Sequence, residues 1–110
     1  MIADLNYLKT MSGGDSKFIR EMIELFREQV DEYKAIMPVL LQKKKYDDLS
    51  KMAHKAKSSV AVMGMSKVAE ILKELEILAQ GGKEVEQYES MINEFLEQSQ
   101  LALVELEGTY

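Results

Sequence analysis

The sequence contains no cysteine, no tryptophan, and only one histidine and one proline. Without cysteine there can be no disulfide framework and no thiolate chemistry, and a single histidine cannot form a His-rich metal cluster. Stability must therefore come from packing, for which the 46% of hydrophobic residues are sufficient. A length of 110 residues is typical of one domain, so we expect residues 1–110 to fold as a single unit.

Positive charge is also scarce, because 14 Lys and Arg residues face 19 Asp and Glu residues and leave a net charge of −5. That sign disfavours binding to nucleic-acid phosphates. No apolar run approaches the roughly 20 residues of a membrane span, and residues 1–11 lack the basic and then apolar order of a signal peptide. We therefore expect a cytoplasmic protein that neither binds nucleic acid nor inserts into a membrane.

Six glycines, one proline and few β-branched residues leave little to favour strands, whereas apolar residues recur every three or four positions. This periodicity predicts an all-α fold. Short connections between the four longer segments predict an antiparallel four-helix bundle, with the first, short helix as an addition. The expected helices cover about residues 2–11, 16–44, 46–63, 66–80 and 85–106.

Local signals refine these boundaries. Asp15 or Ser16 can cap the second helix, and Ser66 can cap the fourth. Gly81-Gly82 is expected to end the fourth helix with a left-handed residue, and the fifth helix to follow directly. Pro38 removes a backbone donor inside the second segment, so we expect a kink or a restart there.

His54 lies in the third predicted helix, and a helical wheel at 100° per residue separates two faces around it. Polar or small residues within about 60° of His54 are Asp47, Ser50, Lys51, Lys57, Ser58 and Ala61. Apolar residues on the far side are Leu49, Met52, Ala56, Val60 and Met63. The wheel therefore predicts that His54 points into solvent.

An exposed imidazole suits nucleophilic chemistry, because histidine side chains ordinarily titrate near pH 6.5 and can form covalent intermediates. A phosphoryl group on such a ring would need positive partners nearby. Lys57, one turn further on, can supply one, and Lys51, one turn earlier, is a second candidate. The small side chains of Ser58 and Ala61 leave room for a second protein to reach the imidazole.

The residues from Ala53 to Gly64 read AHKAKSSVAVMG, a pattern that resembles the histidine-containing phosphotransfer (HPt) family over nearly the whole chain. The family pattern is His-x-x-Lys, then a small residue, and a glycine ten residues after the histidine. His54 matches the phosphoacceptor of the family, Lys57 matches the lysine near the phosphate, and Gly64 matches the glycine. We assign Ser58, Ala61 and Gly64 to access and packing near His54. The small residue is most often glycine in the family and is Ser58 here. Flanking segments that also fit are 14–26, Tyr46-Asp47-Asp48-Leu49, Leu75-Glu76 and Gly81-Gly82.

The resemblance implies a phosphoryl carrier without kinase activity, cofactor or metal of its own, and the sequence contains no glycine-rich phosphate loop. Its implied partners are a sensor or hybrid histidine kinase and a response-regulator receiver domain, whose aspartate would exchange the group with His54 and whose Mg²⁺ would neutralise charge. We expect a monomer. The receiver would dock on an apolar patch, formed by Phe18, Met22 and Leu25 or by Leu5 and Leu8 of the first helix.

Two other interpretations remain open from the sequence. An interaction or scaffold bundle could share the fold while His54 is unreactive. A metal or enzyme site could instead combine His54 with the carboxylates Glu70, Glu74 and Glu76, although one histidine and no Glu-x-x-His pair argue against it.

Overall fold

The computed structural model describes residues 2–108, and within them every regular element is helical, as predicted. The helices are α1 (Asn6–Ser12), α2 (Ser16–Gln42), α3 (Tyr46–Val62), α4 (Ser66–Gln80) and α5 (Tyr88–Glu107), with a short 3₁₀ turn η1 (Val85–Gln87) before α5.

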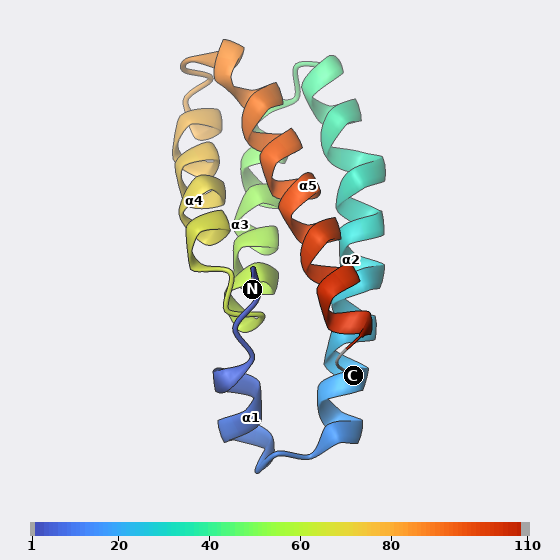
Figure 1. The fold of residues 1–110 in the computed structure, drawn as a ribbon. Helices are drawn as coiled ribbons and strands as arrows, with labels where there is room; N and C mark the ends of the chain where they lie inside the picture. The colour runs from blue at the N-terminus through green and yellow to red at the C-terminus, as the bar shows by residue number, and fades with distance from the viewer. Residues whose placement is uncertain (1, 109–110) are drawn as a thin grey trace.

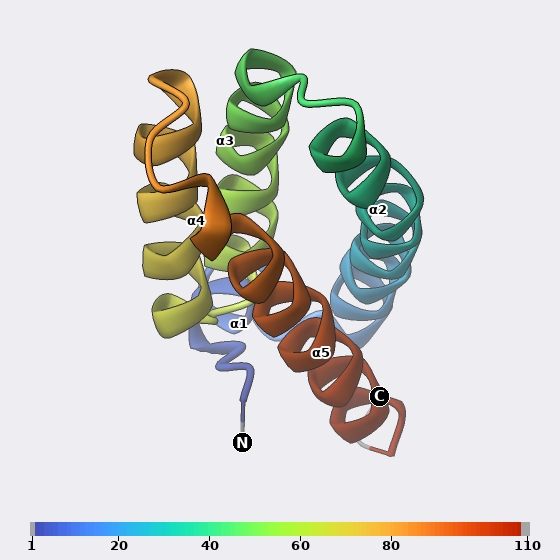
Figure 2. The same ribbon diagram turned by 90° about the horizontal axis from the view of Figure 1, so that it is seen from above.

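The four longer helices lie side by side along the length of an elongated molecule of 42 × 21 × 20 Å (Figure 1). Helix α3 packs against α4 and α2, and α5 packs against the other sides of α2 and α4. Seen from above, α3 stands between α4 and α2 while α5 crosses on the opposite side (Figure 2). The outer face of α3, which carries His54, is therefore not covered by α5.

One continuous apolar core joins all five helices. Tyr33 of α2 and Phe95 of α5 meet in it with ring centroids 5.7 Å apart and are both fully buried. Burial of a large apolar side chain contributes roughly 1.5–3 kcal/mol, so this core supplies the main stabilisation in a chain without disulfides. The largest fully buried side chains are Tyr33, Tyr88, Phe26, Phe95, Leu8, Ile19, Met37, Leu49, Met63, Met65, Leu72 and Leu75.

The second helix begins as predicted but does not restart at Pro38. The Asp15 carboxylate caps it by accepting the backbone N–H groups of Lys17 at 2.9 Å and Phe18 at 3.3 Å. The helix then continues through Pro38 to Gln42. The expected restart is wrong because Pro38 and Lys34, whose carbonyl loses its partner, are both exposed, so water can hydrate that carbonyl.

The ends of α4 differ in detail from the prediction. Met65 is the N-cap residue and Ser66 is already helical, so the predicted serine cap is wrong. Of the two glycines that follow α4, only Gly82 is left-handed, with a φ of 62°. The η1 turn separates this stop from α5. The Tyr88 hydroxyl donates to the Leu78 carbonyl at 2.8 Å and so ties the start of α5 to the end of α4.

The first helix is shorter than predicted, and the residues before it run across the turn between α3 and α4. The Asp4 N–H donates to the Met63 carbonyl at 3.0 Å. Gly64 lies directly beneath: its φ is 70°, and a Cβ added to it would stand 1.9 Å from the Asp4 carbonyl oxygen. Leu5 and Leu8 are both buried in the core, so the expectation that they are free to dock a partner is wrong.

Candidate functional site

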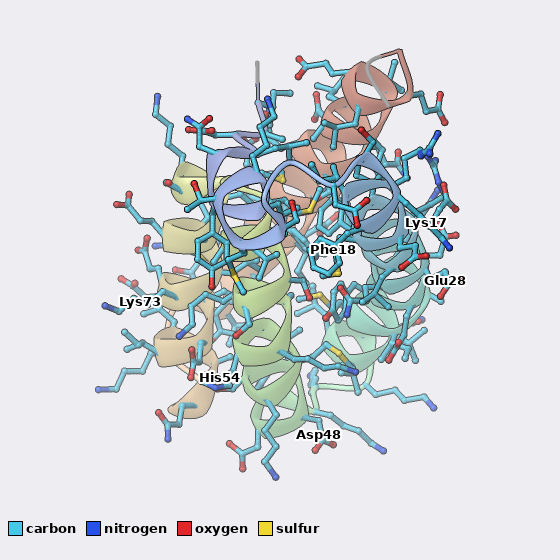
Figure 3. All side chains as sticks on the ribbon, turned by 90° about the horizontal axis from the view of Figure 1, so that it is seen from below. Lys17, Phe18, Glu28, Asp48, His54 and Lys73 are labelled. Carbon is cyan, nitrogen blue, oxygen red and sulfur yellow. The ribbon has the colours of Figure 1, made fainter. Side chains whose placement is uncertain are left out.

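His54 lies in the middle of α3 with 62% of its side chain exposed, which confirms the outward orientation predicted by the wheel. Its neighbours Ala53 and Ala56 are fully buried, and Leu49 and Val60 anchor the opposite face of the helix in the core. Figure 3 shows the imidazole at the side of α3 that faces α4. The fold therefore presents an exposed imidazole on a helix whose opposite face is anchored in the core.

A carboxylate from α4 holds one ring nitrogen. The Nδ1 atom of His54 lies 2.9 Å from Oε2 of Glu76. Since an ionised carboxylate only accepts hydrogen bonds, Nδ1 carries the proton in the neutral ring and Nε2 keeps its lone pair. Nε2 makes no hydrogen bond within residues 2–108. The nitrogen farther from the backbone therefore keeps an unengaged lone pair within residues 2–108.

Lys57 completes this group from the next turn of α3. Its Nζ atom donates to Oε1 of Glu76 at 3.0 Å, so one carboxylate bridges the lysine and the histidine. The hydrogen bond from Lys57 is the largest cause that holds the pKa of Glu76 below its ordinary value, and the bond from His54 adds to it against the opposing effect of desolvation. Glu76 is therefore ionised at neutral pH.

The Ser50 side chain contacts the backbone of the same glutamate. The Ser50 hydroxyl donates to the Glu76 carbonyl at 2.7 Å, and the side chain is 7% exposed. The prediction that Ser50 belongs to the open face around His54 is therefore wrong. The wheel describes α3 alone, whereas α4 covers the edge on which Ser50 lies.

The remaining predicted residues separate into near and distant ones. Ser58 and Ala61 are exposed on the turns that follow His54, and the Ser58 hydroxyl makes no hydrogen bond within residues 2–108, so they leave the approach open. Lys51 is exposed and makes neither a hydrogen bond nor an ion pair with any residue in that range. Gly64 lies against Asp4 beyond the end of α3, so its assignment to packing near His54 is wrong.

An apolar surface borders the site on the side of α2. Leu25 is 43% exposed, whereas Phe18 and Met22 are half-buried and pack against the core. In Figure 3, Phe18 lies between α3 and the outer side of α2, where Lys17 and Glu28 project into solvent. A shallow groove of about 200 Å³ between α2 and α3 connects this patch to the helix that carries His54. Its lining residues are Met22, Leu25, Phe26, Gln29, Ser58, Ser59, Val62 and Met63.

Sequence reasoning missed the role of Glu76, which it treated as part of a family segment and of an alternative carboxylate site. The signal that could have found it is the position of a glutamate at the edge of the apolar stripe of α4, between the core residues Leu75 and Ala79. It also missed Tyr7 and Met11, which are more than half exposed on α1. Leu8 lies on the inner face of that short helix, and Leu5, the N-cap residue before it, is also buried.

Other kinds of site have less support in residues 2–108. That part of the chain holds no group of three or more His, Asp or Glu side chains placed to bind a metal ion. None of its helices is both long enough and apolar enough to span a membrane.

The arrangement of His54, Glu76 and Lys57 can accept and hold an electrophilic, negatively charged group, because a free nucleophilic nitrogen stands beside an ammonium ion. The family model of the Hpt domain matches residues 21–107, which cover α3, α4, α5 and most of α2. Comparisons with curated proteins and with solved structures gave no match. The chain belongs to the Hpt domain family, whose members carry phosphoryl groups in the phosphorelays of two-component signalling.

Proposed function

We propose that His54 is the phosphoacceptor of this Hpt domain and exchanges a phosphoryl group with an aspartate of a response-regulator receiver domain. The observation that carries the proposal is the geometry of the ring: its Nδ1 is held by Glu76 at 2.9 Å while Nε2 is free on an exposed surface. A protein-to-protein transfer requires such an accessible, oriented nitrogen.

In the proposed step, the Nε2 lone pair attacks the phosphorus of the aspartyl phosphate, an N–P bond forms, and the P–O bond to the aspartate breaks. The aspartate leaves as a carboxylate. Since Nδ1 keeps its proton, the phosphorylated ring carries a positive charge that the Glu76 carboxylate stabilises, and Lys57 stabilises the phosphoryl oxygens. A Mg²⁺ ion in the receiver would neutralise charge on the phosphoryl group during transfer in either direction.

The receiver is proposed to dock over α2 and α3. Leu25, Met22 and Phe18 offer an apolar anchor beside the groove, and Ser58 and Ala61 keep the surface low between that groove and His54. Lys55, paired with Glu32 at 3.5 Å, and Lys51, which has no ion-pair partner among residues 2–108, add positive charge to the same face. This charge suits the acidic residues that a Mg²⁺-binding receiver site requires.

The wider proposal is a carrier that acts as a cytoplasmic monomer between a sensor or hybrid histidine kinase and the receiver. It includes the finer description of the fold as one antiparallel four-helix bundle, residues 1–110, with α1 as an appendage. The contacts of α3 with α2 and α4, and of α5 with the same two helices, support this description.

The direct test is to incubate the protein with receiver domains that carry a labelled aspartyl phosphate. Wild-type protein is expected to acquire label that is stable in alkali and lost in acid, as a phosphohistidine is, and His54→Gln to acquire none while its circular dichroism stays helical. Lys55→Gln, on the next residue, is the matched control and is expected to remain labelled. Labelled His54→Gln would refute the proposal, and unlabelled but folded wild type would favour an interaction module with an unreactive histidine.

A further inference from the structure

Three side chains along one edge of α3 contact a single residue of α4. Ser50 donates its hydroxyl hydrogen to the Glu76 carbonyl at 2.7 Å, His54 donates from Nδ1 to Oε2 at 2.9 Å, and Lys57 donates to Oε1 at 3.0 Å. Spacings of four and three residues place the donors on successive turns of the same edge. The histidine and the lysine hold the carboxylate, and Ser50 holds the backbone from which that carboxylate extends.

The bond from Ser50 ties the backbone of α4 at Glu76 to α3, within a helix pair that also packs through the core. Each residue advances a helix by about 1.5 Å, so a slide of α4 along α3 by about two residues would carry Oε2 of Glu76 out of hydrogen-bonding range of the His54 ring, from which it now lies 2.9 Å away. Ser50 is 7% exposed, and its bond is therefore shielded from competing water. The Glu76 carbonyl can accept this bond with its second lone pair while it also serves the helical ladder of α4.

We propose that Ser50 is a positioning residue for the phosphoacceptor: it anchors the Glu76 backbone so that the carboxylate reaches Nδ1 and keeps Nε2 unprotonated. This inference rests on the proposed function of His54. Ser50 touches neither the ring nor a phosphoryl group and acts through Glu76. A pre-placed carboxylate selects the reactive tautomer before the partner arrives, and small displacements of such groups slow reactions strongly.

The matched control is Ser59 of the same helix, whose hydroxyl lies 3.0 Å from the Tyr33 hydroxyl and also bonds the Lys55 carbonyl, without contact to Glu76. Ser50→Ala and Ser59→Ala each remove a side-chain hydroxyl that links α3 to a neighbouring helix. Ser50→Thr retains the hydroxyl at the site. Any effect of merely loosening α3 should therefore appear in both alanine variants, whereas loss of positioning should appear in Ser50→Ala alone.

Two readouts decide the proposal. The first is the ¹⁵N NMR spectrum of the His54 ring at a pH where the ring is neutral, which reports the ratio of the Nδ1–H and Nε2–H tautomers. Ser50→Ala is expected to lower the Nδ1–H fraction, and Ser59→Ala and Ser50→Thr to keep the wild-type ratio. The second is the rate of labelling from a phosphorylated receiver, which Ser50→Ala should reduce by about three- to tenfold, as expected for a misplaced orienting group.

A wild-type tautomer ratio in folded Ser50→Ala would overturn the proposal, as would an equal change in Ser59→Ala. If Ser50→Ala fails to fold, Ser50→Thr decides the proposal. This variant retains the hydroxyl and must keep the wild-type tautomer ratio and labelling rate, and a change in either would overturn the proposal. The NMR readout needs no phosphoryl donor. Failure of the wild type to become labelled would therefore refute the proposed function of His54, while the tautomer ratio would still test the positioning role.

Discussion

The Nδ1 atom of His54 in α3 lies 2.9 Å from Oε2 of Glu76 in α4, a residue 22 positions further along the chain. This one contact converts an exposed histidine into an oriented one, because it assigns the proton to Nδ1 and leaves the lone pair on Nε2. Lys57 at 3.0 Å from the other carboxylate oxygen keeps Glu76 ionised.

Glu76→Gln should reduce the stability of the fold in a pH-dependent way. The pKa of Glu76 is lowered in the folded chain, chiefly by the bond from Lys57, so the unfolded chain binds the proton more readily and stability rises with pH through this window. The stabilisation is complete above the ordinary glutamate value of 4.5 and is lost as the pH falls through the lower folded value. Urea unfolding of both proteins from about pH 3 to about pH 7 should therefore show curves that converge in acid.

The control for that experiment is Glu74→Gln, because Glu74 is exposed on another side of α4 and forms no ion pair within residues 2–108. Its substitution should leave the pH dependence of unfolding almost unchanged. A Glu76→Gln difference that stays constant down to the lowest pH would contradict the assignment of that pH dependence to this carboxylate.

Lys57→Ala should slow phosphoryl transfer to His54 by roughly 10- to 100-fold, since the ammonium that stabilises the phosphoryl oxygens is lost. Transfer reactions with a phosphorylated receiver, quenched at a series of times, measure this rate. Lys55→Ala removes a lysine that pairs with Glu32 instead and should change the rate less than about threefold. Equal effects of the two variants would indicate a general contribution of charge and not a specific role of Lys57.

Ser58→Gln should block a protein partner more than a small one. The longer side chain would stand one turn from His54 on the open surface, where a receiver must approach but a small molecule can enter from the side. Transfer from a receiver is expected to fall by about tenfold or more, and labelling by phosphoramidate to stay within about twofold. Ser66→Gln, at the start of α4, should affect neither reaction.

Leu25→Asp should weaken the complex with the receiver by about tenfold, because it places a charge in the apolar patch proposed for docking. Ile77 of α4 is 60% exposed and lies outside the groove, so Ile77→Asp is the matched control. Isothermal titration calorimetry compares the two affinities. If both variants bind like the wild type, the receiver docks elsewhere.

Gly64→Ala should destabilise the fold far more than Gly13→Ala, although both glycines are left-handed, with φ of 70° and 66°. The left-handed conformation alone costs alanine about 1–2 kcal/mol. At Gly64 the added Cβ also meets the Asp4 carbonyl oxygen at 1.9 Å, whereas nothing lies within 4 Å at Gly13. Chemical denaturation should show an additional loss of about 1–3 kcal/mol at Gly64, together with faster amide exchange at Asp4. Equal losses would mean that this contact adds nothing to stability.

Several features of this protein could be read from the sequence alone. Apolar periodicity predicted the number of helices and most of their boundaries, because a stripe of apolar residues at helical spacing marks where each helix runs. The same periodicity predicted that His54 is exposed, and the spacing of His54, Lys57 and Gly64 indicated the family.

Other features depend on how helices meet. A wheel for α3 cannot reveal that α4 covers Ser50 or that Glu76 reaches His54, because both depend on the rotation and offset of the neighbouring helix. Gly64 is a second example. Its spacing from His54 belongs to the sequence motif, but the residue that it contacts is Asp4, near the N-terminus, which the motif does not reveal. The sequence alone thus determined which residue is exposed, and only the tertiary structure decided which nitrogen of that residue is free, since hydrogen bonds between helices are set by packing and not by local periodicity.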